Sequence, residues 1–251
     1  MAHELTQREV LDIATCMGYY IIKNGGEVSR AEDTVERIGL AYGMDSVHVF
    51  AIGHLIIVSM EKDDVSLSQT RRVKGVSTNL NQIEKFNSLS RKICETHPSY
   101  DEVAKEIEKT SEIPVYPYWI AVLAFALVSG GFTVFFGGNL LEGIISFFIG
   151  AALKPVMTFF EKLKSPIFFA NAAGAAVIVS LTQVANVIFG GINSEMVNIG
   201  VLMNLVPGVL LTNCIRDFVA ADYVAGVAKI VETLLIAAAI SLGVAVSLLW
   251  R

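Results

Sequence analysis

The second half of the chain alternates long apolar runs with short polar breaks. Five of these runs approach the length of about 20 mostly apolar residues that a helix needs to cross a bilayer. They cover residues 119–136, 140–160, 166–189, 196–214 and 223–250. Because a bilayer core offers backbone groups no water to bond, helices are the expected form of runs this long. The pattern therefore predicts an all-α transmembrane bundle of about five helices.

The first half follows a different pattern, with shorter elements and both helical and strand periods. The predicted elements are helices over 5–24, 30–42, 80–96 and 100–109, and two or three antiparallel strands within 46–60 and 65–73. The first helix should stop at Asn24-Gly25-Gly26, because glycine ends helices readily. The second should start at Ser29-Arg30-Ala31-Glu32, which has the spacing of a capping box.

Composition separates the two halves further. The chain has 251 residues, of which 53% are hydrophobic and only 17% are charged, and 31 of the 43 formally charged residues lie in 1–113. The net charge of −5 also arises in this half, so the second half has too few charges to form a water-facing surface. We therefore expect an α+β soluble domain at 1–113 and a transmembrane helical domain at 114–251.

Several functional classes are disfavoured by the residues present. The charge balance does not suggest nucleic-acid binding, and Cys16, Cys94 and Cys214 fit neither a disulfide framework nor a paired metal motif. His48 and His54 would share a strand face only if one strand continued unbroken between them. The sequence contains no Walker A, G-x-S-x-G or H-E-x-x-H motif, which argues against a pump driven directly by ATP. We expect no enzyme activity, no cofactor and no metal.

Charges in the short loops predict an orientation. Lys162 and Lys164 follow the second apolar run and Arg216 follows the fourth, whereas the other two connections carry no Lys or Arg. The positive-inside rule places the lysine and arginine loops in the cytoplasm. We therefore expect a multi-pass protein of the cell (inner) membrane, with a cytoplasmic N-terminal domain and with Arg251 outside.

Small residues recur at intervals of four in three of the predicted helices, and this spacing lets helices approach closely. They are Ser146 and Gly150; Ala172, Ala176 and Ser180; and Ala239, Gly243 and Ser247. The spacing predicts tight packing within the bundle.

Ionisable residues inside spanning segments are costly and are therefore candidates for function. Lys154 adjoins Pro155, which is predicted to interrupt the second run, and its stem can also simply reach the interface. Lys229 and Glu232 are three apart in the fifth run, so they face the same way. They either form a structural ion pair or, if the pair opens, allow Glu232 to carry a proton.

The fourth run is unusual because Pro207-Gly208 lies in its middle. Proline removes one backbone hydrogen bond and frees a carbonyl, and broken helices near the bilayer centre often line substrate sites. A structural kink is the alternative. The polar residues around this break are Asn204, Asn213, Arg216, Asp217 and Asp222. Arg216 suits a substrate carboxylate, or it could pair with Asp217 or Asp222.

A second polar cluster lies in the soluble half, at Glu27, Arg30, Glu32 and Asp33. Helix capping and surface charge explain such a cluster most simply. A role in gating, or in contact with the membrane half, is the alternative.

Two separated motifs resemble the N-terminal half of the threonine/serine exporter family. The first is the run from Gly25 to Asp33, with Arg37 and Gly43 beyond it. The second is Leu205-Val206-Pro207-Gly208, followed by Arg216-Asp217, Asp222 and Gly226. The resemblance covers nearly the whole chain. It implies a secondary transporter that exports small amino acids with the proton gradient. Some members are split into two subunits, related systems are linked to succinate export, and this chain resembles the larger subunit.

These observations lead to one main hypothesis and two alternatives. The main hypothesis is a subunit of a proton-coupled exporter of threonine and serine, or of a small dicarboxylate such as succinate. The expected substrate-binding residues are Asn204, Pro207, Gly208, Asn213, Arg216 and Lys154, and the expected proton-coupling residues are Asp217, Asp222 and Glu232. The alternatives are a regulatory or scaffolding membrane subunit, and a membrane-tethered hydrolase that uses the Glu27–Asp33 cluster.

The main hypothesis also implies a set of partners. We expect a second small membrane subunit that completes the transporter, the lipid bilayer and a small carboxylate-bearing substrate. A homo-oligomer is possible, and nucleic acid is not expected.

Overall fold

The computed structural model describes residues 5–112 and 116–249. The chain forms two compact units, which are described separately. The first unit contains residues up to 114 together with 212–229, and the second contains 115–211 together with the residues from 230 onward. The predicted boundary at 113/114, the end of the last predicted helix at Trp250 and the placement of Arg251 lie outside the described residues.

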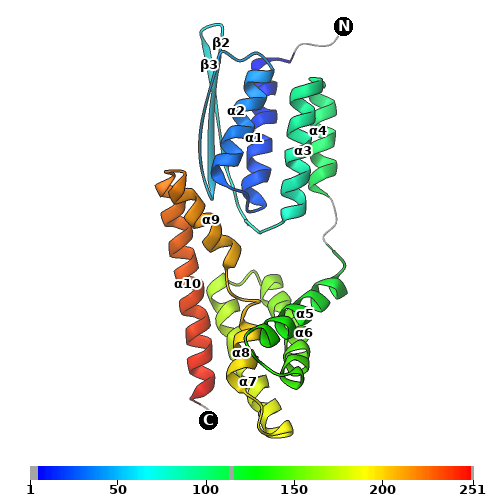
Figure 1. Ribbon diagram of the computed structural model, residues 1–251. Coiled ribbons are helices and arrows are strands. Elements are labelled where there is room, and N and C mark those ends of the chain that lie inside the picture. The colour runs from blue at the N-terminus through cyan, green and yellow to red at the C-terminus, as the bar shows by residue number, and fades with distance from the viewer. Residues whose placement is uncertain (1–4, 113–115, 250–251) are drawn as a thin grey trace. The chain divides into compact units, whose positions relative to one another are not determined.

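The first unit is a three-stranded sheet covered by helices (Figure 1). Its elements are α1 (Gln7–Lys23), α2 (Val28–Ala41), β1 (Ser46–Ile52), β2 (Leu55–Lys62), β3 (Val65–Arg72), α3 (Leu80–Thr96) and α4 (Tyr100–Ser111). The strands are antiparallel in the order β1-β2-β3. α1 and α2 pack on the sheet, and α3 and α4 pack on α1. The predicted helices and antiparallel strands of this region are confirmed.

α1 is the central helix of this core because its apolar residues repeat at helical spacing. Val10, Met17 and Ile21 are completely buried, and each buried side chain of this size contributes about 1.5–3 kcal/mol relative to exposure. The helix starts with a capping box between Thr6 and Glu9. It ends where the sequence predicts, at Asn24 before two glycines.

α2 begins two residues earlier than predicted, so the predicted capping box at Ser29 is wrong. Ser29 lies inside the first turn, and the N-cap is Glu27, which makes no side-chain capping bond. Glu32 does not reach back to the cap either, because its carboxylate accepts a hydrogen bond of 2.8 Å from the Ala51 N–H in β1. Spacing alone could not distinguish a local cap from a contact with the neighbouring strand.

The two histidines of the strand region do not share a strand. β1 ends at Ile52 and β2 starts at Leu55, so a turn separates His48 in β1 from His54. The next turn uses Asp63 and Asp64, both with positive φ, the conformation that two-residue hairpin turns require.

The second unit is helical. It contains α5 (Tyr118–Phe135), α6 (Leu140–Lys162), α7 (Ile167–Phe189) and α8 (Ser194–Leu202), while α9 (Gly208–Val219) and α10 (Tyr223–Leu248) contribute to both units (Figure 1). Within the described ranges, four helices are long and apolar enough to cross a membrane: α5, α6, α7 and α10. The chain is therefore a multi-pass membrane protein by length and composition of its helices.

The predicted count of about five spanning helices is not reproduced, because the fourth apolar run is not one helix. It is divided into α8 with nine residues and α9 with twelve. Pro207 has no N–H to continue α8, and its carbonyl instead accepts from the Leu211 N–H at 3.0 Å in the first turn of α9. The predicted spanning helix over 140–160 is confirmed as α6, which continues through Pro155 to Lys162.

The predicted close packing of small residues is confirmed. A Cβ added to Gly150 of α6 would lie 2.1 Å from Ser129 Oγ of α5. A Cβ added to Gly243 of α10 would lie 2.1 Å from the Ala172 carbonyl oxygen of α7. These positions bring helix backbones closer than any larger residue permits.

Candidate functional site

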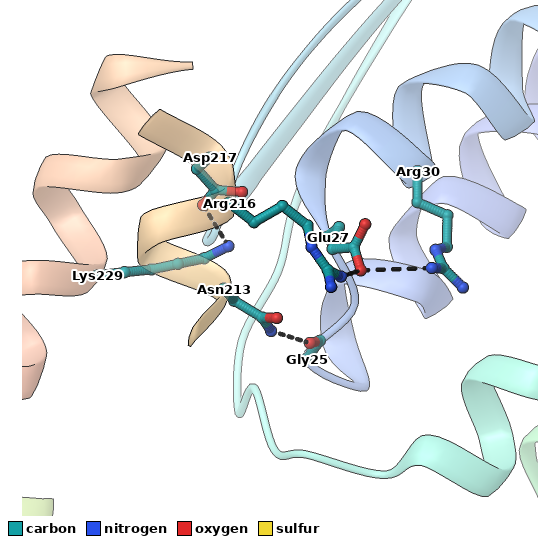
Figure 2. A network of polar contacts seen from close by, with 7 residues as sticks. All are labelled: Gly25, Glu27, Arg30, Asn213, Arg216, Asp217 and Lys229. Carbon is teal, nitrogen blue, oxygen red and sulfur yellow. Dashed lines mark hydrogen bonds and ion pairs between the residues drawn. The ribbon is translucent and has the colours of Figure 1, made fainter. Parts of the chain in front are cut away.

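The first motif and the Arg216 end of the second motif, which are far apart in the sequence, meet within the first unit. We name this meeting point the polar junction; it consists of Gly25, Glu27, Arg30, Asn213 and Arg216 (Figure 2). Glu27 Oε1 accepts hydrogen bonds from Arg30 Nη2 at 3.3 Å and from Arg216 Nη1. Asn213 Nδ2 donates to the Gly25 carbonyl at 3.3 Å. Two side chains of α9 therefore bind the segment that precedes α2.

The guanidinium groups of the polar junction remain accessible to solvent. The Arg216 side chain is 53% exposed and that of Arg30 is 44% exposed, whereas that of Glu27 is only 17% exposed. An ion pair with such an exposed arginine contributes about 0–1 kcal/mol. The Glu27–Arg216 pair is therefore weak enough for another carboxylate to compete for Arg216.

Asp217 follows Arg216 in α9, but its side chain points to a different partner, Lys229 of α10 (Figure 2). Lys229 Nζ lies 2.6 Å from Asp217 Oδ2, and these side chains are only 12% and 3% exposed. The sequence allowed pairs of Lys229 with Glu232 and of Arg216 with Asp217 or Asp222. In the structure, Lys229 bonds Asp217 and Arg216 bonds Glu27. Because adjacent residues in a helix point in different directions, the charges of Arg216 and Asp217 face different neighbours.

Asp222 and Glu32 lie close enough to influence each other. Asp222 Oδ1 accepts from the Ala225 N–H at 3.3 Å, at the start of α10. Burial raises the pKa of the Glu32 carboxyl, the hydrogen bond from Ala51 lowers it, and the negative charge of Asp222 raises it further. The first unit thus holds a carboxyl group whose ionised form is disfavoured by its surroundings.

In the second unit, Asn204 anchors the break between α8 and α9. Its Nδ2 donates to Ser129 Oγ at 2.8 Å and to the Val201 carbonyl at 3.1 Å. One turn further along α5, Thr133 Oγ1 lies 2.6 Å from Ser146 Oγ of α6. We name these four side chains, Ser129, Thr133, Ser146 and Asn204, the hydroxyl–amide cluster. Their hydrogen bonds satisfy polar groups that would otherwise be costly inside an apolar bundle.

The remaining predicted site residues have individual surroundings. The Lys154 side chain is 16% exposed, with Nζ 3.7 Å from Glu161 Oε1 and 5.2 Å from the centre of the Phe125 ring. Pro207 and Gly208 form the turn into α9, and a Cβ on Gly208 would meet nothing within 4 Å. Glu232 lies half-buried in α10. The structure therefore brings Asn213 and Arg216 together at the segment before α2, directs Asp217 to Lys229, and places Asn204 and Lys154 in the second unit.

Sequence reasoning did not select Ser129, Thr133 or Glu142 as site residues. Ser129 and Thr133 are four apart in α5, and Glu142 and Ser146 are four apart in α6. Polar residues at this spacing on two neighbouring apolar helices are the signal that would have found them. Glu142 is a carboxylate that is only 4% exposed, and burial of this kind cannot be read from one sequence.

A pocket of about 730 Å³ lies elsewhere in the first unit, where α1, β3 and the start of α4 meet. Arg8, Asp12, Gln69 and Tyr100 are among its lining residues. Asp12 accepts from Tyr100 at 2.9 Å and from Gln69 at 3.1 Å. The predicted site residues do not line this pocket.

Together, the membrane-length helices and the α+β unit define a multi-pass membrane protein with a polar broken helix. The family model described as "Putative threonine/serine exporter" (ThrE) matches residues 12–250. The chain therefore belongs to this family, and an exporter role follows at the family level.

Curated relatives of two kinds match the chain. A Mycobacterium tuberculosis protein named "Probable threonine/serine exporter" is 21% identical over 98% of this chain and 47% of its own length. A Corynebacterium glutamicum "Threonine/serine exporter" is 23% identical over 94% of this chain and 50% of its own length. An Escherichia coli protein named "Probable succinate transporter subunit YjjP" is 25% identical over 96% of this chain and 94% of its own length. No solved structure matches the chain.

The chain thus spans about half the length of the two exporter relatives and nearly the whole length of the transporter subunit.

Proposed function

We propose that this chain is a subunit of a secondary exporter that moves small carboxylate-bearing metabolites out of the cell with the proton gradient. The candidate substrates are threonine, serine and a small dicarboxylate such as succinate. The observation that carries the proposal is the pair of Glu27 with the exposed Arg216 at the polar junction. Arg216 is already bound to a carboxylate of the protein itself, and a substrate carboxylate offers the same two acceptor oxygens.

Substrate binding in this proposal is an exchange of partners. A substrate carboxylate replaces Glu27 at Arg216, and the Asn213 amide adds a donor beside it. Asn204, Pro207, Gly208 and Lys154 shape the path through the helical unit, since broken helices often line substrate sites. Because the Glu27–Arg216 pair is partly exposed and weak, the exchange costs little free energy.

Proton coupling is assigned to Asp217, Asp222 and Glu232, and the surroundings of Asp217 support it best. Its carboxylate is buried against Lys229. Protonation of Asp217 would remove its negative charge from beside the Lys229 ammonium, and breaking a buried pair in this way costs about 3–5 kcal/mol. Uptake of one proton can therefore change the preferred arrangement of α9 against α10.

The proposal also includes a partner and an orientation. The E. coli relative of matching length is named a subunit, whereas the exporter relatives are about twice as long. This difference supports a second membrane subunit that completes the transporter. The soluble unit at residues 1–113 would face the cytoplasm, where Arg216 would meet the substrate before export, and the C-terminus would lie outside the inner membrane.

The test is efflux of labelled threonine, serine and succinate from vesicles that contain this chain with its candidate second subunit, with and without a pH gradient. We expect gradient-dependent efflux of at least one substrate. Arg216→Ala should reduce it by up to about fivefold, since an ion pair with an arginine this exposed contributes about 0–1 kcal/mol. Arg30→Ala is the matched control, because Arg30 shares Glu27 but does not lie on α9.

Unchanged efflux in Arg216→Ala would remove Arg216 from substrate binding. Equal efflux from vesicles with the second subunit alone would instead favour the regulatory or scaffolding role. Absence of gradient-dependent efflux for all three substrates would exclude the proposed activity for them.

A further inference from the structure

Glu142 is a buried carboxylate at the end of the helical unit that carries the two short loops. It is 4% exposed and lies in the first turn of α6. Its Oε2 accepts from the Asn139 N–H at 2.7 Å, and its Oε1 accepts from the Asn193 N–H at 2.8 Å. The first bond belongs to the local capping box of α6. The second bond reaches 51 residues along the chain and holds the start of α8.

α8 is fastened at both ends by hydrogen bonds to its neighbours. Asn193, its N-cap, is held by Glu142, and Asn204, beyond its C-terminus, is held by Ser129. Between them, a Cβ on Gly200 would lie 2.0 Å from Thr133 Oγ1, so α8 packs directly on α5. The Glu142–Asn193 bond is thus one of two polar attachments of the half-helix that precedes the Pro207 break.

Only the ionised carboxylate can keep both of these bonds. A carboxylate accepts on two oxygens, whereas a neutral carboxylic acid carries a proton on one of them and donates from it. A proton on Oε1 would face the Asn193 N–H, so two donors would meet and the bond would be lost. A proton on Oε2 would instead face the Asn139 N–H of the local capping box, so release of α8 requires the proton on Oε1.

The charged neighbours of Glu142 are few. α6 packs on α5, α7 and α8. α5 and α7 contain no Asp, Glu, Lys, Arg or His, and α8 contributes only Glu195, which is exposed. On α6 itself, the other ionisable residues are Lys154, Glu161 and Lys162, three or more turns away. Glu142 is therefore the buried ionisable group at this end of α6.

We propose that Glu142 is a proton-binding residue of the transport cycle: in its ionised form it fastens α8 to α6, and on protonation it releases α8. The proton comes from the solution at this end of the bundle, binds Oε1 in place of the Asn193 N–H, and returns to solution when the bond forms again. The proposal rests on the proposed exporter function and on its orientation, in which this end of the bundle faces the outside. Its structural part can be measured without any substrate.

The test is hydrogen exchange of the backbone amides of residues 193–200 in the full chain in lipid nanodiscs at a series of pH values. At each pH, the exchange rate of a variant is divided by that of the wild type, because this ratio removes the intrinsic pH dependence of exchange. In the Glu142→Gln variant we expect exchange about tenfold faster than wild type at high pH, because a bond to a charged group is lost. At low pH the two should converge. Glu195→Gln, the neighbouring carboxylate on α8, should follow the wild type throughout.

A second pair of variants covers the case in which Glu142→Gln does not fold. Asn193 has φ −76°, which proline can adopt. Asn193→Pro removes the N–H and should show fast exchange of α8 at every pH. Asn193→Ala loses only the side-chain cap, so it should keep the pH dependence of the wild type.

The outcomes separate this proposal from the exporter function. If the ratio of exchange rates between Glu142→Gln and the wild type did not change with pH, the role of Glu142 would be overturned, whatever the vesicles transport. If the exchange pattern is as expected, efflux of labelled threonine or succinate from Glu142→Gln vesicles should no longer respond to a pH gradient. A response equal to the wild type would overturn the role in coupling.

Discussion

Glu32 illustrates how one carboxyl group can link separate elements of the first unit. It lies on α2, bonds the Ala51 N–H of β1, and is influenced by the charge of Asp222 before α10. Its pKa lies above the ordinary value of 4.5, chiefly because burial disfavours the charge. The folded protein therefore holds the proton more tightly than the unfolded chain does.

This shift predicts a pH dependence of stability. The stabilisation from protonated Glu32 is fully present below pH 4.5 and is lost as the pH rises through the higher folded value. Thermal unfolding of the full chain should therefore show a decline over this range that the Glu32→Gln variant lacks. Glu36→Gln, an exposed carboxylate on the same helix, is the control and should retain the decline. Identical profiles for Glu32→Gln and wild type would contradict the shift.

At the scale of elements, the helices of the helical unit approach closely at small residues. Gly150 and Gly243 each lie where any side chain would collide with the neighbouring helix. Ser247 Oγ lies 3.0 Å from the Ala176 carbonyl, which adds a hydrogen bond between α10 and α7. In lipid, where apolar burial does not drive helices together, such contacts carry the association.

Gly243→Ala should therefore destabilise the bundle, because the new methyl group would lie 2.1 Å from the Ala172 carbonyl oxygen. We expect a cost of about 1–3 kcal/mol, typical of overpacking, and a lower midpoint of thermal unfolding in detergent. Gly131→Ala is the matched control, since its Cβ would meet nothing within 4 Å. Alanine is the better helix former by up to about 1 kcal/mol, so this control should not lose stability. Equal losses in both variants would contradict the packing argument.

At the scale of the whole molecule, the proposed orientation predicts which side of the membrane each loop faces. Loop charges predict that Lys162 and Arg216 face the cytoplasm. Lys162 and Leu140 lie at the two ends of α6, and both are exposed. They therefore form a matched pair of reporters on a single helix.

In a chain without its native cysteines, Leu140→Cys should react with a membrane-impermeant thiol reagent added to intact cells. Lys162→Cys should react only after the membrane is permeabilised. The reverse pattern would place the soluble unit outside and would overturn the orientation proposed for substrate capture. Equal reaction of both positions in intact cells would show that α6 does not span the membrane.

Much of the secondary structure could be predicted because it depends on local periodicity. The predicted helix over 80–96 matches α3, and the predicted strands match β1 to β3 within a few residues. The predicted number of spanning helices differed at the fourth apolar run. Hydropathy does not distinguish a continuous helix from α8 and α9 joined through Pro207. Pro155 shows the opposite case, since a helix with neighbouring helices to support it tolerates a proline.

The candidate site, like the secondary structure, could be predicted only in part. The residue types at the fourth apolar run, the arginine and the two motifs were visible in the sequence, because unusual residues in an apolar run stand out locally. Their partners were not: Glu27 lies 189 residues from Arg216, and Asp217 bonds Lys229 rather than its neighbours. Glu142 and Asn193 likewise meet only through folding. Hydrophobic periodicity, loop charge and helix breaks depend on residues within one or two helical turns of each other, so the sequence by itself determines them. Ion pairs and buried hydrogen bonds depend on which faces meet in space, and only the tertiary structure decides that.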